Sequence, residues 1–164
     1  MHEVDRTALE ASIAADVRAL TAESDQLGHT FAARHAMTAN DFRALLHVMV
    51  AETAGEPLTA GELRKRMGVS AAAITYLVER MIGSGHLRRD VDPADRRKVK
   101  LRVSGHGMDV ARGFFTPLAG HVRAGLADLP DADLATAHRV FTAVGDAMRA
   151  FLGELAGELD VRPG

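Results

Sequence analysis

The stretch from Leu58 to Ser104 constrains the fold of this chain more than any other part of it. It opens with Thr59 and Glu62, a capping-box pair in which each side chain can bind a backbone N–H at the start of a helix. Gly68 is a suitable end for that helix, because glycine tolerates the positive φ of a helix stop. Ser70 is a good N-cap for a second helix. Two helices joined by a short turn that contains glycine predict a helix-turn-helix.

The second helix has one apolar face and one face of small and polar residues. The apolar residues recur at spacings of three and four, and they are Ile74, Leu77, Val78, Met81 and Ile82. Small side chains on the other face would let the helix approach base edges, and the polar ones can contact bases or phosphates. We therefore predict DNA contacts from Ser70, Ala71, Ala72, Thr75, Tyr76 and Arg80. An ordinary amphipathic helix with a solvated face would show the same pattern, so this helix alone does not decide between the two interpretations.

The segment after the second helix favours the DNA-binding interpretation. Residues 98–103 alternate between cationic and apolar side chains, so Val99, Leu101 and Val103 are expected on one face of a half-buried strand. Residues 86–90 are the candidate partner strand. A helix-turn-helix followed by a basic two-stranded hairpin predicts a winged helix.

A loop with a cationic tip connects the two strands. Arginine at such a tip suits a narrow minor groove, where the negative potential of DNA is concentrated. We predict DNA contacts from Arg96, Arg97 and Lys98, and we expect Asp95 to orient Arg97 through an ion pair. A charged surface hairpin without a ligand is the alternative.

The charge of the chain is concentrated in this same stretch. The whole chain has a formal net charge of -2, but residues 61–102 contain 11 basic and 5 acidic side chains and therefore carry +6. The remaining residues carry -8. A basic segment within an acidic protein is typical of a surface that binds the phosphates of nucleic acid.

The flanking sequences predict long helices. Residues 6–31, 41–54, 105–127 and 131–159 place apolar side chains three and four apart. In the third of these helices the stripe consists of Met108, Ala111, Phe115, Leu118, Val122 and Leu126. In the last one the spacing alternates between three and four without interruption, as in a coiled-coil seam, through Leu134, Ala137, Phe141, Val144, Met148, Phe151 and Leu155. Such a seam packs either within one chain or between two, and we favour a dimer.

These patterns together predict a mainly α fold with a small two-stranded β-wing, in which a winged helix-turn-helix is flanked by long dimerisation helices. We expect an N-terminal dimerisation helix in residues 1–36, a DNA-binding lobe in residues 37–103 and C-terminal dimerisation helices in residues 104–164.

The central third of the chain resembles the MarR (multiple antibiotic resistance regulator) family of bacterial regulators. The most specific resemblance is the wing sequence Asp92-Pro93-Ala94-Asp95-Arg96-Arg97, and Gly68-Val69-Ser70, Leu77-Val78 and Arg80-Met81 agree with it. The resemblance implies a homodimer on a pseudo-palindromic operator. It also implies a small-molecule effector, often an anionic phenolic compound, that usually relieves repression.

The family places its effector between the dimer helices and the DNA-binding lobe. Candidate apolar walls of such a pocket are Phe31, Met37, Phe42 and Leu46. Candidate groups that would neutralise a carboxylate or donate to a phenolate are Arg34, His35, Arg43 and His47. The alternative for each residue is that the apolar side chains form core and the polar ones face water.

Other classes of function have less support in the sequence. The chain has no cysteine, which excludes disulfides, zinc–thiolate sites and thiol redox sensing, and no catalytic motif is visible, so we expect neither an enzyme nor a cofactor. Its eight histidines are never three to five residues apart, so we expect no local metal site. We expect a cytoplasmic protein, because neither a signal peptide nor an apolar run of about 18 residues is present. A metal-responsive regulator on the same fold and a winged helix used only for protein contacts are the alternatives.

Overall fold

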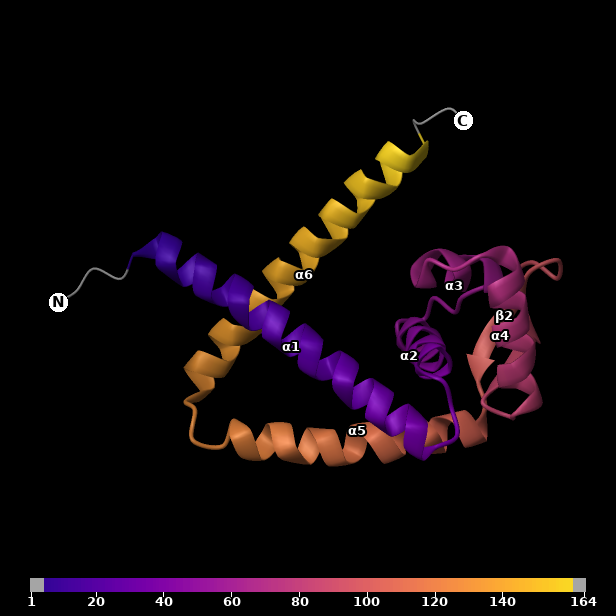
Figure 1. Cartoon of the computed structure of the whole chain (residues 1–164), viewed down its shortest axis with the longest axis horizontal. Coiled ribbons are helices and arrows are strands. Elements are labelled where there is room, and N and C mark those ends of the chain that lie inside the picture. Colours follow the sequence, from indigo (N-terminus) through magenta and orange to yellow (C-terminus); the bar gives the residue numbers. More distant parts are fainter. Residues whose placement is uncertain (1–4, 161–164) are drawn as a thin grey trace. The chain divides into compact units, whose positions relative to one another are not determined.

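The computed structural model describes residues 5–160, and within this range the chain is mainly helical with one two-stranded sheet (Figure 1). The elements, in chain order, are α1 (Arg6–Arg34), α2 (Ala39–Thr53), α3 (Ala60–Met67), α4 (Ala71–Gly83), β1 (Leu87–Val91), β2 (Val99–Val103), α5 (Gly105–Gly125) and α6 (Asp131–Asp160). This confirms the predicted fold class, a winged helix-turn-helix between long helices. None of the described helices is both long enough and apolar enough to cross a membrane.

The chain divides into two compact units at Pro117, within α5. The first unit contains α1 to β2 and the beginning of α5, and therefore the whole winged helix. The second contains the end of α5 and α6.

Residues close in sequence start and stop the helices of the winged helix. Thr59 and Glu62 form the expected capping box, with N–H to side-chain oxygen distances of 2.6 and 3.2 Å. Gly68 ends α3 with φ of +66°, and the Ser70 side chain accepts the Ala73 N–H at 3.2 Å to begin α4. A second capping box, between Thr38 and Asp41, begins α2. Each cap binds backbone donors that would otherwise lack a partner in the first turn.

One hydrophobic core lies under α2, α3, α4 and the sheet. Its most buried large side chains are Phe42, Leu45, Val48, Leu63, Val78, Met81, Leu87 and Leu101. Burial of each such side chain stabilises the fold by roughly 1.5–3 kcal/mol. The expected apolar face of α4 supplies Ile74, Leu77, Val78 and Met81 to this core, and the opposite face of the helix remains in solvent.

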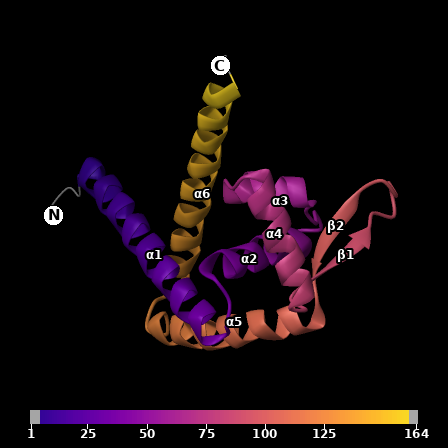
Figure 2. The same ribbon diagram turned by 45° about the vertical axis from the view of Figure 1, so that its right-hand side comes forward.

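The strands β1 and β2 lie side by side as an antiparallel hairpin (Figure 2). Leu87 lies opposite Val103, and Val91 lies opposite Val99. The outer edge of β2 is tied to the helical part of the lobe. Its Leu101 N–H donates to the Leu58 carbonyl at 2.7 Å, and its Val103 N–H donates to the Glu52 carboxylate at 2.9 Å. Because these bonds use N–H groups that would otherwise lie on a free sheet edge, they fix the base of the wing to α2 and to the α2–α3 connection.

Two details of the expected core are wrong. Val99 alternates with Leu101 and Val103 as predicted, but its side chain is 42% exposed because it lies at the end of β2, beyond the helices that cover the sheet. In α5, Phe114 packs against the core together with Met108 and Val110, whereas Phe115, which we had placed on the apolar stripe, is 37% exposed. Helical spacing is compatible with burial of either Phe114 or Phe115. Phe114 is the more buried one because it packs against aromatic side chains of α1 and α2.

Candidate nucleic-acid interface

The exposed face of α4 carries the residues that we predicted to contact DNA. Ser70, Ala71, Ala72, Thr75 and Tyr76 are all exposed, and the Tyr76 side chain is 68% exposed. The Thr75 hydroxyl donates to the Ala71 carbonyl within the helix at 2.9 Å. This face therefore combines small side chains with the hydroxyl groups of Ser70, Thr75 and Tyr76, and it could lie close to the floor of a major groove.

Arg80, the sixth predicted contact on this helix, is only partly exposed and is engaged within the protein. Its Nη2 donates to Oδ1 of Asp41 on α2 and lies 3.5 Å from the Thr38 hydroxyl. Burial disfavours the Asp41 carboxylate, but hydrogen bonds from Arg80 and Thr38 outweigh it, so the pKa of Asp41 is below its ordinary value. The spacing of residues along α4 indicated that Arg80 lies on the exposed face of the helix. It could not indicate that Asp41 of α2 would be its partner.

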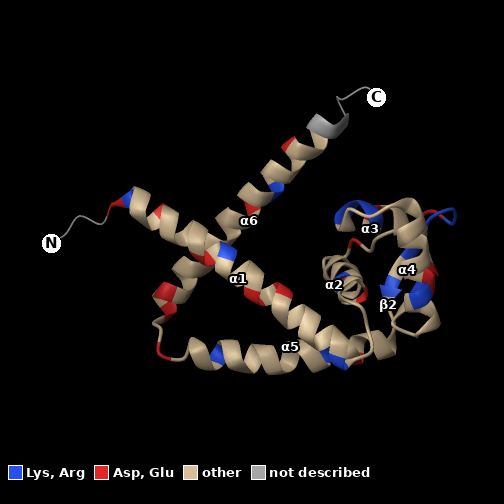
Figure 3. Cartoon of the chain, in the orientation of Figure 1, with Lys and Arg blue, Asp and Glu red and all other residues tan. Residues whose placement is uncertain are grey.

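The wing tip carries three consecutive exposed cations, Arg96, Arg97 and Lys98. Blue marks Lys and Arg along this loop in Figure 3. Asp95 organises the tip, but not through the ion pair that we expected. Its carboxylate accepts the backbone N–H of Arg97 at 3.1 Å, and its carbonyl accepts the N–H of Lys98 at 2.8 Å. An Asp side chain often closes a turn in this way, and the arrangement leaves the Arg97 guanidinium in solvent, where it could meet phosphate or a groove.

Further charges on the lobe were absent from the predicted interface. Lys65 and Arg66 are exposed on the last turn of α3, directly before the turn that leads to α4. Cations stabilise the C-terminal end of a helix, and on the first helix of a helix-turn-helix they also face the DNA backbone. The run of three basic residues before Met67 was the sequence signal for them.

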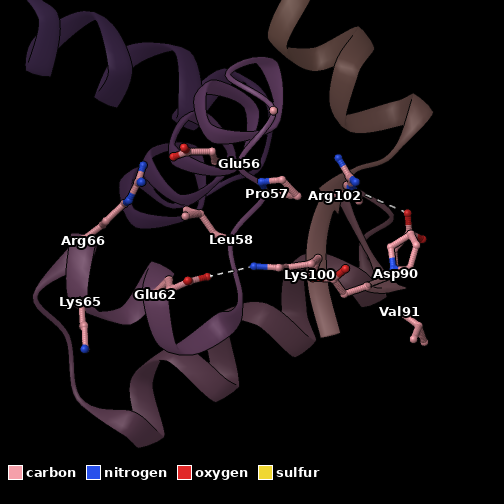
Figure 4. A pocket seen from close by; sticks show the side chains of 13 residues that line it. Glu56, Pro57, Leu58, Glu62, Lys65, Arg66, Asp90, Val91, Lys100 and Arg102 are labelled. Carbon is pink, nitrogen blue, oxygen red and sulfur yellow. Dashed lines mark ion pairs between the residues drawn. The ribbon is translucent and has the colours of Figure 1, made fainter. Parts of the chain in front are cut away.

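A charged hollow of about 740 Å³ lies between the α2–α3 connection, α3 and the base of the wing (Figure 4). Two ion pairs lie along its walls, Lys100–Glu62 at 3.6 Å and Arg102–Asp90 at 3.7 Å. On the side of α4, Glu79 pairs with Arg89 of β1 at 2.5 Å. The Lys100–Glu62 and Arg89–Glu79 pairs connect the wing to α3 and α4, and the Arg102–Asp90 pair connects the two strands of the wing.

The eight candidate effector residues fall into two groups in the structure. Phe31, His35 and Phe42 come together, with Phe31 stacked on His35 at 3.9 Å between ring centroids and Phe42 at 5.1 Å from Phe31. Phe114 of α5, which we had not selected, completes this cluster at 5.0 Å from Phe31 and 4.9 Å from Phe42. Met37 is buried in the adjoining core, and Arg34 is exposed.

The second group consists of Arg43, Leu46 and His47 of α2. Burial lowers the pKa of His47, and the nearby cations Arg43 and Arg66 lower it further. Leu46 packs against the core. Within residues 5–160, no three His, Cys, Asp or Glu side chains are arranged to hold a metal ion.

Comparison with known proteins agrees with this geometry. Residues 36–98 match the model of the MarR family. An uncharacterised HTH-type transcriptional regulator of Bacillus subtilis, YcgE, is 38% identical over 63 residues, which are 38% of this chain and 41% of that protein, so the match spans about two fifths of the relative's length.

Solved structures extend the similarity of fold to most of the chain. A MarR family protein from Bacillus stearothermophilus has a TM-score of 0.68 at 21% identity, over 88% of this chain and 98% of the other. The S. aureus MepR–DNA complex has a TM-score of 0.56 at 13% identity, over 80% and 93%. Residues 36–98 of this chain are therefore similar in sequence to the MarR family, and most of the described chain shares the winged-helix fold of solved MarR proteins.

Proposed function

We propose that this chain is a homodimeric transcription regulator that binds a specific DNA operator and has no enzymatic activity. The observation that carries the proposal is the combination, on one lobe, of the exposed α4 face with the cationic tip of the wing. The helix has the dimensions and small side chains needed in a major groove, and the wing tip has the charge needed at the adjacent backbone and minor groove. The same fold in the MepR–DNA complex supports this mode of docking.

The exposed side chains of α6 support a homodimer. Five large apolar side chains on this helix are 41–66% exposed within the single chain: Phe141, Met148, Phe151, Leu152 and Leu155. An apolar surface of this kind is unusual on a monomer and is covered when a second copy packs against it. A two-fold dimer would hold two α4 helices and would therefore read two half-sites about 34–36 Å apart.

We also propose that the regulator is a repressor that a small anionic aromatic compound releases. The cluster of Phe31, Phe42 and Phe114 offers aromatic walls, and the His35 ring beside it offers a hydrogen-bonding group. The cluster joins α1, α2 and α5, so a ligand there could alter how the winged helix is held. Such a ligand changes operator affinity only as far as its own affinity differs between the two arrangements.

Selection from a randomised duplex library tests the proposed function, because the operator need not be known in advance. The full chain is expected to enrich an inverted repeat whose half-sites are separated by about one helical turn. Failure to enrich any sequence, with a folded protein, would falsify specific DNA binding and leave the protein-interaction alternative. If the enriched duplex is released by a divalent metal and by no aromatic acid, the metal-responsive alternative replaces the proposed effector.

A further inference from the structure

One guanidinium connects a buried carboxylate to the most prominent side chain of the DNA-facing helix. Arg80 donates from Nη2 to Asp41, and its Cζ lies 5.0 Å from the centroid of the Tyr76 ring, one turn earlier on α4. Asp41 is 4% exposed and Tyr76 is 68% exposed. The link therefore runs from the core of the lobe to the surface that would meet DNA.

Arg80 is poorly placed to leave this arrangement and contact DNA. Asp41 uses its other carboxylate oxygen to accept the Thr38 N–H at 3.0 Å, so it is held in the α2 capping box. If Arg80 turned towards a phosphate, a buried carboxylate would lose its cationic partner, which is strongly unfavourable. The Nε of Arg80 is buried without a hydrogen-bond partner, and the contacts that hold the guanidinium are the bond from Nη2 to Asp41 and the packing over the Tyr76 ring.

The chemistry of the exposed α4 face indicates which feature of DNA it would recognise. The Ala71 and Ala72 side chains offer no donor or acceptor, and the Thr75 hydroxyl donates its proton to the Ala71 carbonyl, so its oxygen can only accept. The largest apolar surface on this face is the Tyr76 ring, which is 68% exposed. The apolar group that the major groove displays is the C5-methyl of thymine.

We propose that Tyr76 determines operator specificity by packing its ring against a thymine methyl group, and that Asp41 is a positioning residue that fixes this ring through Arg80. The proposal rests on the DNA-binding function proposed above. It replaces the expected DNA contact of Arg80 with a structural role. A ring held in place before binding loses less conformational freedom when the complex forms, so the link favours the specific complex.

The thymine contact is tested on the operator enriched by selection, with deoxyuridine replacing the half-site thymines one at a time. Deoxyuridine lacks only the methyl group. Wild type and Tyr76→Phe should each lose about tenfold in affinity at one position, and Tyr76→Ala should bind the unmodified operator about tenfold more weakly and ignore the replacement. If Tyr76→Ala and wild type lose equal affinity on deoxyuridine replacement at every position, the contact is overturned.

The positioning role is tested without DNA. The chain has one tyrosine and no tryptophan, so its intrinsic fluorescence reports the Tyr76 ring alone. Time-resolved fluorescence anisotropy should show faster local motion of this ring in Asp41→Asn than in wild type. Glu62→Gln is the matched control, because Glu62 occupies the same capping-box position on α3 and its polar partners are Thr59 and Lys100.

A second variant is used in case Asp41→Asn does not fold. In Asp41→Asn/Arg80→Gln, neutral amides replace both ions, so no charge remains buried alone. This variant should also free the ring, and it should lose several-fold in affinity for the operator while its affinity for random duplex is unchanged. Unchanged ring motion in a folded variant overturns the role of Asp41.

The two levels of the proposal fail in different ways. If selection enriches no sequence, both the proposed function and the proposed contact of Tyr76 with a thymine methyl group are overturned. The anisotropy measurement is made without DNA, so it decides the Asp41–Arg80–Tyr76 link independently of that result.

Discussion

Gly107 lies so close to the carbonyl group of His86 that a β-carbon at this position would be 2.1 Å from the carbonyl oxygen. It would also be 3.0 Å from Cγ1 of Val103. The first turn of α5 thus packs directly on the backbone at the base of the wing. The hydroxyl of Ser104, the N-cap of α5, donates to the Gly85 carbonyl and so joins the same two segments.

Gly107→Ala should therefore destabilise the protein by about 1–3 kcal/mol, because the helix or the strand must move to admit the methyl group. Chemical unfolding followed by circular dichroism measures the change. Gly113→Ala is the matched control on the same helix: its β-carbon would meet nothing within 4 Å, so it should stabilise by about 0.5–1 kcal/mol. Equal effects of the two substitutions would contradict the close contact.

His86 makes the stability of the lobe dependent on pH. It is 7% exposed, its Nδ1 lies 2.7 Å from the Ser84 hydroxyl, and its ring centroid is 4.7 Å from that of His106. Burial lowers the pKa of His86, and His106 and His35 lower it further, whereas Asp41 opposes the change. The unfolded chain therefore binds a proton more readily than the folded one, so stability falls as pH drops through about 6.5 towards the folded value.

The free energy of unfolding of wild type should decrease from about pH 7.5 to about pH 5.5, and His86→Gln should reduce this decrease. His47 has a lowered pKa and contributes in the same direction, so the informative quantity is the difference between variant and wild type. His138→Gln, at an exposed position on α6, is the control and should retain the wild-type dependence. An unaltered pH dependence in His86→Gln would remove His86 as its cause.

The two neighbouring cations of the wing tip should have different effects on DNA binding. Arg97→Ala should weaken operator binding by about 1–3 kcal/mol, as expected for loss of a specific groove contact. Lys98→Ala should lower affinity for all sequences and reduce the dependence on salt concentration, as expected for loss of a phosphate contact. Titrations at several salt concentrations, with Arg112→Ala on α5 as control, distinguish the two. Wing docking is wrong if Arg97→Ala binds the operator as wild type does.

Removal of the chain after Pro130 should convert the proposed dimer into a monomer. The deletion takes away all of α6 and its exposed apolar side chains, each of which contributes roughly 1.5–3 kcal/mol when it is buried between two copies. Specific binding should fall much more than non-specific binding, because two half-sites no longer act together. Analytical ultracentrifugation measures the assembly state. Phe141→Asp tests the same interface in a full-length chain, and a dimer in both variants would contradict the proposal.

An anionic aromatic compound such as salicylate should raise the thermal stability of the protein and lower its affinity for the operator. We predict that Arg43→Ala or His47→Ala weakens both effects. The structure adds His35→Ala as the discriminating variant, because His35 stacks on Phe31 within the aromatic cluster and His47 does not belong to that cluster. Thermal shift and operator titration with a panel of aromatic acids provide the measurements. A panel that produces neither effect would remove the proposed pocket and leave the DNA-binding proposal intact.

Much of the winged helix could be predicted from the sequence because its signals act over a few residues. The hydroxyls of Thr59, Ser70 and Ser104 each bind an N–H three residues ahead, and Gly68 supplies a positive φ that depends on its own backbone alone. The turn at the wing tip is likewise closed by Asp95 two residues from its partner. Such interactions are determined by local geometry, so the order of elements and the exposed face of α4 followed from the spacing of residues.

The tertiary structure decided what depends on residues distant in the chain. Arg80 looked like one more cation on the DNA-facing helix until folding placed it beside Asp41, 39 positions away. Helical spacing admitted both Phe114 and Phe115 to the core, and the aromatic rings of Phe31 and Phe42 selected the first. The physical reason is the same in each case: periodicity specifies the direction of a side chain relative to its own helix or strand, whereas its partner depends on how separate elements pack together.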